Sequence, residues 1–340
     1  MKTNSKTLFE IKRDEYIELF SPLFLPEDPV SHDIVRYFAS LLRVLGMEDQ
    51  GWDPYAESRK MLEDINSFFF LDLPVERFKD IGLTHWRLGL ILYSHILEMD
   101  APYEVITNLL RFKLSKGYSP NPFFDFLTER EKKSFQKKGI STLRKIEIIK
   151  KLSDESGSGI AKIFDEFYSN KLRNSIAHAD FILTDEDFRC RGDISGINGF
   201  KISYEELDQK ITCAKAFVTA IFQVDLTTRQ FWGLQKQKGI PYDPNYKGLI
   251  EVLVDEQDVM CGFRIHWPNN SESTYRRTES GVEMTNCSLD LEDSNISLFV
   301  NLYAQKSGSF SPLVEYNAKP IYTKLEGTDV IPSWSLKIKS

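Results

Sequence analysis

The chain has 340 residues, of which 41% are hydrophobic and 27% charged, a balance typical of globular proteins that bury a large core. Its net charge of −7 argues against a protein coated in basic surface. No apolar run approaches the roughly 20 residues that span a bilayer, and the first residues lack the pattern of a signal peptide. We therefore expect no membrane association and a cytoplasmic location.

Helical periodicity dominates the first two thirds of the chain. Apolar residues recur there at intervals of three and four, and probable caps and stops separate the segments. The last of these helices begins with an S-x-x-E capping box at Ser203 and Glu206. The predicted helices cover residues 31–46, 59–73, 84–100, 101–114, 128–139, 141–152, 160–178 and 203–226.

The sequence changes character near Leu249. From there on, short runs rich in Val, Ile, Thr, Tyr and Phe alternate with turn residues, which predicts an antiparallel sheet or small sandwich of about five to seven strands. The predicted fold class is α+β, with an all-α N-terminal and central region and a C-terminal antiparallel β domain. We expect an N-terminal helical region at 1–82, a helical bundle at 83–236 and the β domain at 246–340.

One segment is strongly basic although the whole chain is acidic. Residues 111–151 contain 12 Lys or Arg against 4 Asp or Glu. Such a segment could attract a polyanion. The alternative is a solvated helix face and loop, and charge alone favours that alternative.

The common cofactor and metal motifs are absent from the sequence. There is no GxxxxGK[ST] loop, no Rossmann GxGxxG after a predicted strand and no HExxH. The four cysteines, Cys190, Cys213, Cys261 and Cys287, are widely spaced and form no CxxC pair. We predict free thiols, no cofactor and no bound metal.

The segment LRNSIAHADF holds the most suggestive polar cluster, Arg173, Asn174 and His178. On an unbroken helix, which turns about 100° per residue, Asn174 and His178 extend the stripe that carries Phe164 and Phe167. The two side chains would then face packed protein or an interface. Three polar groups so placed need partners, and function is a common reason to keep them.

This segment resembles the R-N-x3-H form of the motif of HEPN domains (higher eukaryotes and prokaryotes nucleotide-binding). An aromatic helix precedes the motif, IFDEFYSNK, and an acidic, aromatic turn follows it, DFILTDEDF. The resemblance covers about 83–222 and is most specific at 171–206. It implies a helical bundle that often dimerises, and in many members a metal-independent ribonuclease of toxin–antitoxin or anti-phage systems.

By position, Arg173, Asn174 and His178 match the three motif residues, and the resemblance makes them the candidate catalytic set. A histidine can serve as base or acid, an arginine can grip a phosphate, and an asparagine can orient either partner. One chain supplies half of an acid–base pair, so we expect a homodimer. The expected partner is RNA, with Lys171, Arg144 and Lys145 as RNA contacts, and an antitoxin protein is a candidate second partner.

Two other interpretations remain open. The helical region could be a non-catalytic RNA-binding or dimerisation module, with the strand-rich domain as the active part. The motif could also be purely structural, because short motifs occur by chance.

Overall fold

A computed structural model provides the structure of the chain. It describes residues 6–27, 33, 36, 37, 40, 54–68, 71, 80–117, 119, 121–190, 199–236, 240, 241, 248–267, 270–278, 281–292, 295–300, 303–306, 309–312, 316–318, 321–326, 329–333 and 336–338. Beyond residue 276 only the backbone is described, apart from residues 285 and 286. The helix predicted at 31–46 lies almost wholly outside the described residues.

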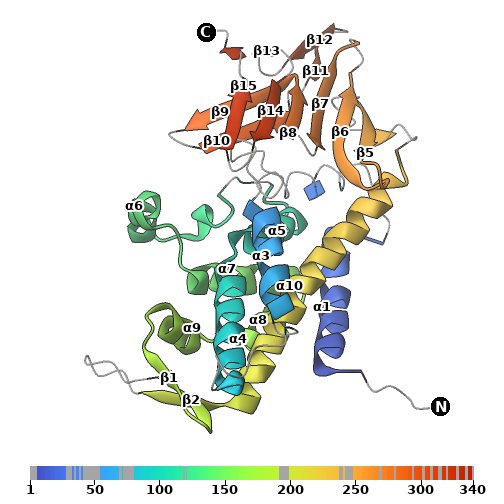
Figure 1. Ribbon diagram of the computed structural model, residues 1–340. Helices are drawn as coiled ribbons and strands as arrows, with labels where there is room; N and C mark the ends of the chain where they lie inside the picture. The colour runs from blue at the N-terminus through green and yellow to red at the C-terminus, as the bar shows by residue number, and fades with distance from the viewer. Residues whose placement is uncertain are drawn as a thin grey trace, which may run out of the picture. The chain divides into compact units, whose positions relative to one another are not determined.

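The predicted α+β class is confirmed. Helices occupy the N-terminal and central chain, and antiparallel strands fill the C-terminal part (Figure 1). The chain divides into two compact units. The helical unit comprises residues 1–23, 56–114 and 121–223, and the strand-rich unit comprises residues 24–55, 115–120 and 224–340. The predicted border at 82/83 therefore falls inside the helical unit.

The helical unit consists of amphipathic helices and one short sheet. The four helices predicted between 84 and 152 form with small shifts of their ends, because apolar spacing and capping residues agree there. Its helices are α1 (Leu8–Phe24), α3 (Pro54–Phe68), α4 (Ile81–Glu98), α5 (Asp100–Lys113), the 3-10 turn η1 (Phe124–Phe126), α6 (Glu129–Lys138), α7 (Thr142–Ser156), α8 (Ala161–Phe167), α9 (Asn170–Ala177) and α10 (Tyr204–Gly233) up to residue 223.

Aromatic side chains fill the centre of this unit. The ring of Phe217 in α10 lies 5.0 Å from that of Phe167 and 5.5 Å from that of Phe164, between ring centroids. Tyr103 of α5 contacts the same cluster, at 6.3 Å from Phe217. All four residues are buried, so the middle of α10 packs against both α5 and α8. Each aromatic ring buries a large apolar area, which makes this cluster a main source of stability.

The central region contains one short antiparallel sheet beside its helices. The acidic, aromatic segment after the motif forms β1 (Phe181–Leu183) and β2 (Asp187–Cys190), and β3 (Phe200–Ser203) completes an antiparallel sheet. The ring of Phe188 stacks on that of Phe181 with centroids 5.1 Å apart. Three or four residues are too few for alternation to show in the sequence.

The strand-rich unit is built around one seven-stranded antiparallel sheet in the order β15-β14-β8-β7-β6-β5-β4. Three two-stranded ladders, β9–β10, β11–β12 and β13–β16, accompany it, so the described part has more strands than the five to seven predicted. The strands are β4 (Ile240–Pro241), β5 (Leu249–Val254), β6 (Met260–His266), β7 (Glu272–Thr278), β8 (Gly281–Thr285), β9 (Cys287–Glu292), β10 (Asn295–Val300), β11 (Tyr303–Lys306), β12 (Ser309–Pro312), β13 (Tyr316–Ala318), β14 (Ile321–Glu326), β15 (Asp329–Ser333) and β16 (Leu336–Ile338).

In strands β5, β6 and β7, successive side chains point to opposite faces of the sheet, and this alternation explains which apolar side chains are buried. Ile250 and Val252 of β5 are buried, as are Ile265 of β6 and Tyr275 of β7. Register places Ile250 opposite Ile265, so the apolar residues of neighbouring strands share one face.

Candidate functional site

The motif lies on α9, a short helix separated from α8 by two extended residues. Tyr168 and Ser169 have ψ angles of 127° and 110°, which end one helix and begin the next. Ser169 caps α9, since its Oγ accepts a hydrogen bond from the backbone N–H of Leu172 at 3.3 Å. The single helix predicted from 160 to 178 is therefore wrong. A serine, which competes with the helix for backbone hydrogen bonds, starts a new helix here.

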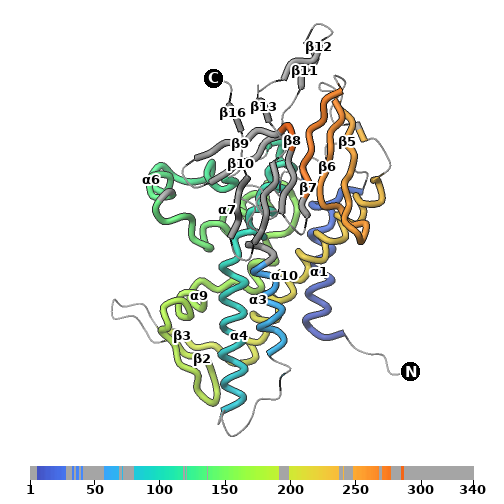
Figure 2. Tube along the Cα trace, turned by 45° about the horizontal axis from the view of Figure 1, so that its top comes forward, coloured from blue at the N-terminus to red at the C-terminus, as the bar shows by residue number. Residues whose placement is uncertain are grey.

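A buried tyrosine from α4 satisfies the backbone at this break. The Tyr93 hydroxyl donates to the carbonyl of Phe167 at 2.8 Å and accepts from the N–H of Ser169 at 3.3 Å. Burial raises the pKa of Tyr93, so its hydroxyl stays protonated and remains a donor. The α8–α9 junction is thereby fixed to α4, and Figures 1 and 2 both show α9 beside α4.

The break also changes which motif side chains are buried. Within α9 the buried residues are Leu172 and Ser175, whereas Asn174 is half-buried and His178 is exposed. The predicted buried stripe of Asn174 and His178 is thus wrong, because the helical phase restarts at Ser169. The imidazole of His178 is open to solvent in this chain.

A Schellman motif ends α9 and sets the position of His178 at its C-cap. The N–H of Asp180 donates to the carbonyl of Ser175 at 2.9 Å, and the N–H of Ala179 donates to that of Ile176 at 3.1 Å. Ala179 adopts a left-handed φ of 52°, which glycine usually occupies in this motif. His178 donates its own N–H to the carbonyl of Asn174 at 3.0 Å, so the two residues lie one turn apart.

Arg173 is held by a carboxylate from another helix. Its Nε donates to Oε1 of Glu98, in the last turn of α4, at 2.6 Å, and its Nη1 donates to Oδ1 of Asn174 at 3.1 Å. The hydrogen bond to Glu98 raises the pKa of the Arg173 guanidinium, and partial burial opposes the shift. The other carboxylate oxygen of Glu98 accepts from the Thr142 hydroxyl at 3.2 Å. Glu98 thus links α4, α7 and α9.

Glu98 is the site residue that the sequence did not identify. It lies 75 positions before Arg173, and its only local partner by helical spacing is His95. No spacing rule connects an acid and an arginine so far apart. The sequence offers one indirect signal of its role. A carboxylate in the last turn of a helix interacts unfavourably with the helix dipole, so its presence suggests a stabilising contact with another residue.

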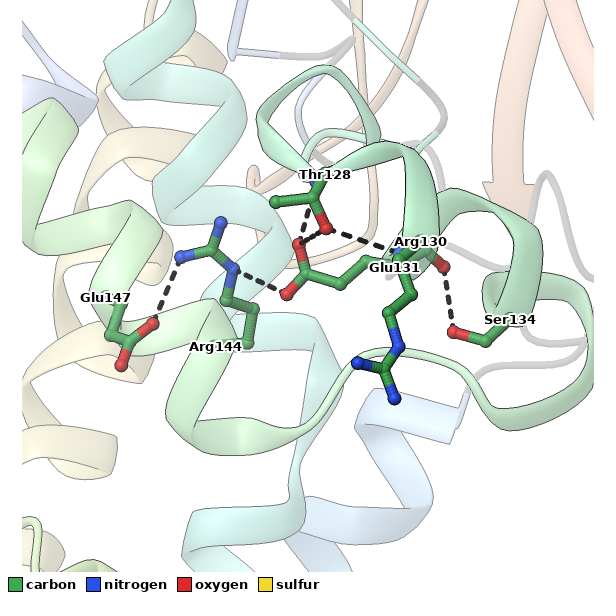
Figure 3. A pocket seen from close by; sticks show the side chains of 6 residues that line it. All are labelled: Thr128, Arg130, Glu131, Ser134, Arg144 and Glu147. Carbon is green, nitrogen blue, oxygen red and sulfur yellow. Dashed lines mark hydrogen bonds and ion pairs between the residues drawn. The ribbon is translucent and has the colours of Figure 1, made fainter.

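The three predicted RNA contacts have different environments. Lys171 is exposed on α9. Lys145 is 7% exposed and forms an ion pair with Asp100. Arg144 is held from both sides, at 3.1 Å from Glu131 and 3.1 Å from Glu147, and it also donates to the carbonyl of Phe126 (Figure 3). Arg144 and Lys145 thus balance carboxylates within the bundle, and Lys171 is the accessible cation of the three.

The strand-rich unit holds a separate polar cluster that sequence patterns did not reveal. The two ring nitrogens of His266 lie 2.8 Å from Glu251 and 3.0 Å from Glu272, on the neighbouring strands β5 and β7. Arg264 lies 3.3 Å from the same oxygen of Glu251. Because each ring nitrogen faces its own carboxylate, this cluster links three strands.

Comparisons with known proteins found no match for this chain. No family model matches the chain, and no curated protein and no solved structure matches it either.

Within the described residues, no helix is both long and apolar enough to cross a lipid bilayer. The same residues contain no group of three or more His, Cys, Asp or Glu side chains arranged to hold a metal ion.

Proposed function

We propose that the chain is a metal-independent endoribonuclease of HEPN type that acts as a homodimer. One observation carries the proposal. Within a single short helix, the guanidinium of Arg173 is hydrogen-bonded to Asn174, and the exposed imidazole of His178 lies one turn further on. These groups provide phosphate binding, orientation and proton transfer in one accessible place.

RNA itself supplies the nucleophile for such a reaction. The ribose 2′-OH loses its proton to a base, its oxygen bonds to phosphorus, and the 5′-oxygen leaves with a proton from an acid. His178 fits either role, because an imidazole can both accept and donate a proton. Each chain brings one such imidazole, so a two-fold dimer that places two copies of α9 at one cleft supplies both base and acid.

Arg173 would stabilise the charge that develops on phosphorus. Its Nε is bound to Glu98 and its Nη1 to Asn174, which leaves Nη2 as the end of the guanidinium with no hydrogen bond to a described residue. Glu98 fixes the direction of that end. A preorganised donor of this kind stabilises a transition state more than a mobile one, because it needs no reorganisation during the reaction.

The test is RNA cleavage in EDTA by the wild-type protein and by His178→Ala. We expect the wild type to cut and the variant to lose at least 100-fold in rate, the usual scale for removing a general acid or base. His85→Ala is the matched control, since it removes another histidine of the same unit. Equal cleavage by the wild type and His178→Ala would remove His178 from the mechanism, and loss of wild-type activity in EDTA would indicate a metal enzyme.

We propose a toxin or anti-phage effector as the cellular role, held in check by an antitoxin protein. The measurement is growth after induced expression of the wild type and of His178→Ala. Growth arrest by the wild type alone supports this role. Normal growth with both proteins contradicts it.

The ion pairing of Arg173 favours a second candidate, a non-catalytic HEPN-like RNA-binding or dimerisation module. An arginine bound to Glu98 at 2.6 Å can serve packing alone. Purified protein that binds RNA, or pairs with itself, without cutting RNA would support this second function.

A further inference from the structure

Helix α6 carries a stripe of uncompensated positive charge. Arg130, Lys133 and Lys137 are all exposed, and among the described residues none of the three has an ion-pair partner. They lie at positions i, i+3 and i+7, so they share one face of the helix over about 10 Å of its axis. We call these three residues the α6 stripe. Lys138, also exposed, is adjacent to it.

The acids of α6 are drawn away from this stripe. Glu131 forms a capping box with Thr128, accepting from its N–H at 2.7 Å, and its other oxygen lies 3.1 Å from Arg144. Glu129 pairs with Lys132 at 3.0 Å. Both carboxylates of the helix are therefore neutralised by residues outside the stripe.

A close view of this region shows how Arg130 of the stripe lies relative to the ion pairs of Glu131. Thr128, Arg130, Glu131, Ser134, Arg144 and Glu147 line an open hollow of about 500 Å³. Hydrogen bonds and ion pairs join Thr128, Glu131, Arg144 and Glu147 there, whereas no such contact joins the side chain of Arg130 to these four residues (Figure 3). The network fixes α6 against α7 through Arg144. The stripe is thus presented on an anchored helix, not on a free loop.

We propose that the α6 stripe is a docking surface for the phosphate backbone of the RNA that α9 is proposed to cleave. This inference rests on the proposed function for its choice of polyanion. Three cations on one face of a helix can contact the phosphates of a single strand, and such contacts gain affinity by releasing counterions. In a chain of net charge −7, a local patch of this kind is where a polyanion would bind.

The composition of α6 argues against a membrane surface as the partner. A helix that lies on a bilayer needs a broad apolar face. The one aromatic residue of α6, Phe135, is half-buried and packs edge-on against Phe124 at 5.6 Å, and the rest of the helix has no aliphatic side chain. The stripe therefore offers charge without an apolar face.

The position of α6 agrees with a strand that reaches the motif. Figures 1 and 2 show α6 and α9 on the same side of α4, within one compact unit. Lys171, exposed on α9, adds a cation beside the motif. An extended strand could contact both helices, with docking at α6 and chemistry at His178.

The experiment measures binding of fluorescent single-stranded RNA as a function of salt. All proteins carry His178→Ala to prevent cleavage, and the test variant adds Arg130→Gln, Lys133→Gln and Lys137→Gln. Each lost contact lowers the slope of log K against log salt by about 0.7, so we expect a slope smaller by roughly 2 and an affinity about 100-fold lower at 0.1 M salt. Glutamine is a good helix former, and circular dichroism checks that α6 is retained.

The matched control removes three exposed lysines from other helices of the same unit: Lys60→Gln, Lys151→Gln and Lys162→Gln. These side chains are 72%, 65% and 53% exposed, and each lies within 4.0 Å of a carboxylate. The change in net charge equals that of the test variant. We expect the control to keep the slope of the protein that carries His178→Ala alone.

The outcomes separate this inference from the nuclease proposal. A reduced slope in the stripe variant alone supports docking at α6, even if the wild-type protein never cuts RNA. Equal slopes in all three proteins overturn docking at α6, even if the wild type cuts RNA in EDTA. Absence of any RNA binding also overturns docking at α6. Binding to vesicles of anionic lipid is measured for the same proteins, and a stripe variant that loses this binding while its RNA slope is unchanged overturns docking at α6 as well.

Discussion

Arg173 and Glu98 join α9 to the last turn of α4 through a hydrogen bond of 2.6 Å from Nε to Oε1. Glu98→Gln keeps the size of the side chain and removes its charge. With Glu98 44% exposed, we expect the free energy of unfolding to change by less than about 1 kcal/mol. We expect kcat for RNA cleavage to fall roughly tenfold, because a neutral amide holds the guanidinium less firmly than a carboxylate does.

Asp165→Asn is the control for this prediction. It neutralises a carboxylate that pairs with Lys150 between α7 and α8, away from the motif. Cleavage by Asp165→Asn should equal that of the wild type. If both variants lose the same activity, the effect is general and Glu98 has no special role in positioning Arg173.

Tyr93→Phe tests the junction between α8 and α9. Removing the hydroxyl leaves the carbonyl of Phe167 and the N–H of Ser169 without this partner at a buried position. We expect a loss of about 1–3 kcal/mol in the free energy of unfolding, measured with urea. Tyr168→Phe, whose hydroxyl donates a hydrogen bond to the exposed Asn170 at 3.2 Å, should cost far less. Equal costs would show that the Tyr93 hydroxyl does not support the break.

Ala179→Gly should stabilise the protein. Ala179 has a left-handed φ of 52° in the Schellman motif that follows His178, a conformation that is strained for alanine and free for glycine. We expect a gain of about 0.5–1 kcal/mol, after the entropy of glycine in the unfolded chain is included. Ala177→Gly, inside α9, should instead lose about 1 kcal/mol. A loss in both variants would rule out the left-handed conformation.

Gly262→Ala tests the register of β6 with β7. A methyl group at Gly262 would lie 2.2 Å from the carbonyl oxygen of Tyr275. Relieving this clash requires the backbone of the adjacent strand to move. We expect a loss of about 1–3 kcal/mol by thermal or urea unfolding. Gly82→Ala in the first turn of α4 meets no atom within 4 Å and should be neutral or stabilising. A neutral Gly262→Ala would show that the two strands pair differently.

The local spacing of apolar residues in the sequence predicts the helices that have clear caps and a clear apolar stripe. α4, α5, α6 and α7 fall where periodicity placed them, because those signals act within a few residues. Sequence alone does not decide between a break at Ser169 and a continuous helix, because the segment around it keeps apolar residues at helical spacing. The hydroxyl that satisfies the break belongs to Tyr93, which lies 76 positions away, so only the fold reveals it.

The candidate site was predictable only in part. The motif residues stand close together in sequence, so Arg173, Asn174 and His178 could be singled out. The contacts that decide what they can do are long-range. Glu98 comes from α4, and carboxylates pair with two of the predicted RNA contacts, Lys145 and Arg144. The exposure of His178 follows from the helix break, which reverses its predicted burial.

The chemistry of the product ends tests most directly whether the chain cleaves RNA through attack by the ribose 2′-OH. An RNA oligonucleotide with one cleavage site is incubated with the wild-type protein in EDTA, and the fragments are analysed by mass spectrometry. A matched oligonucleotide carries a single 2′-deoxy residue at that site. We expect 2′,3′-cyclic phosphate ends from the first oligonucleotide and no cleavage of the second. Fragments with 3′-hydroxyl ends, or equal cleavage of both oligonucleotides, would contradict it.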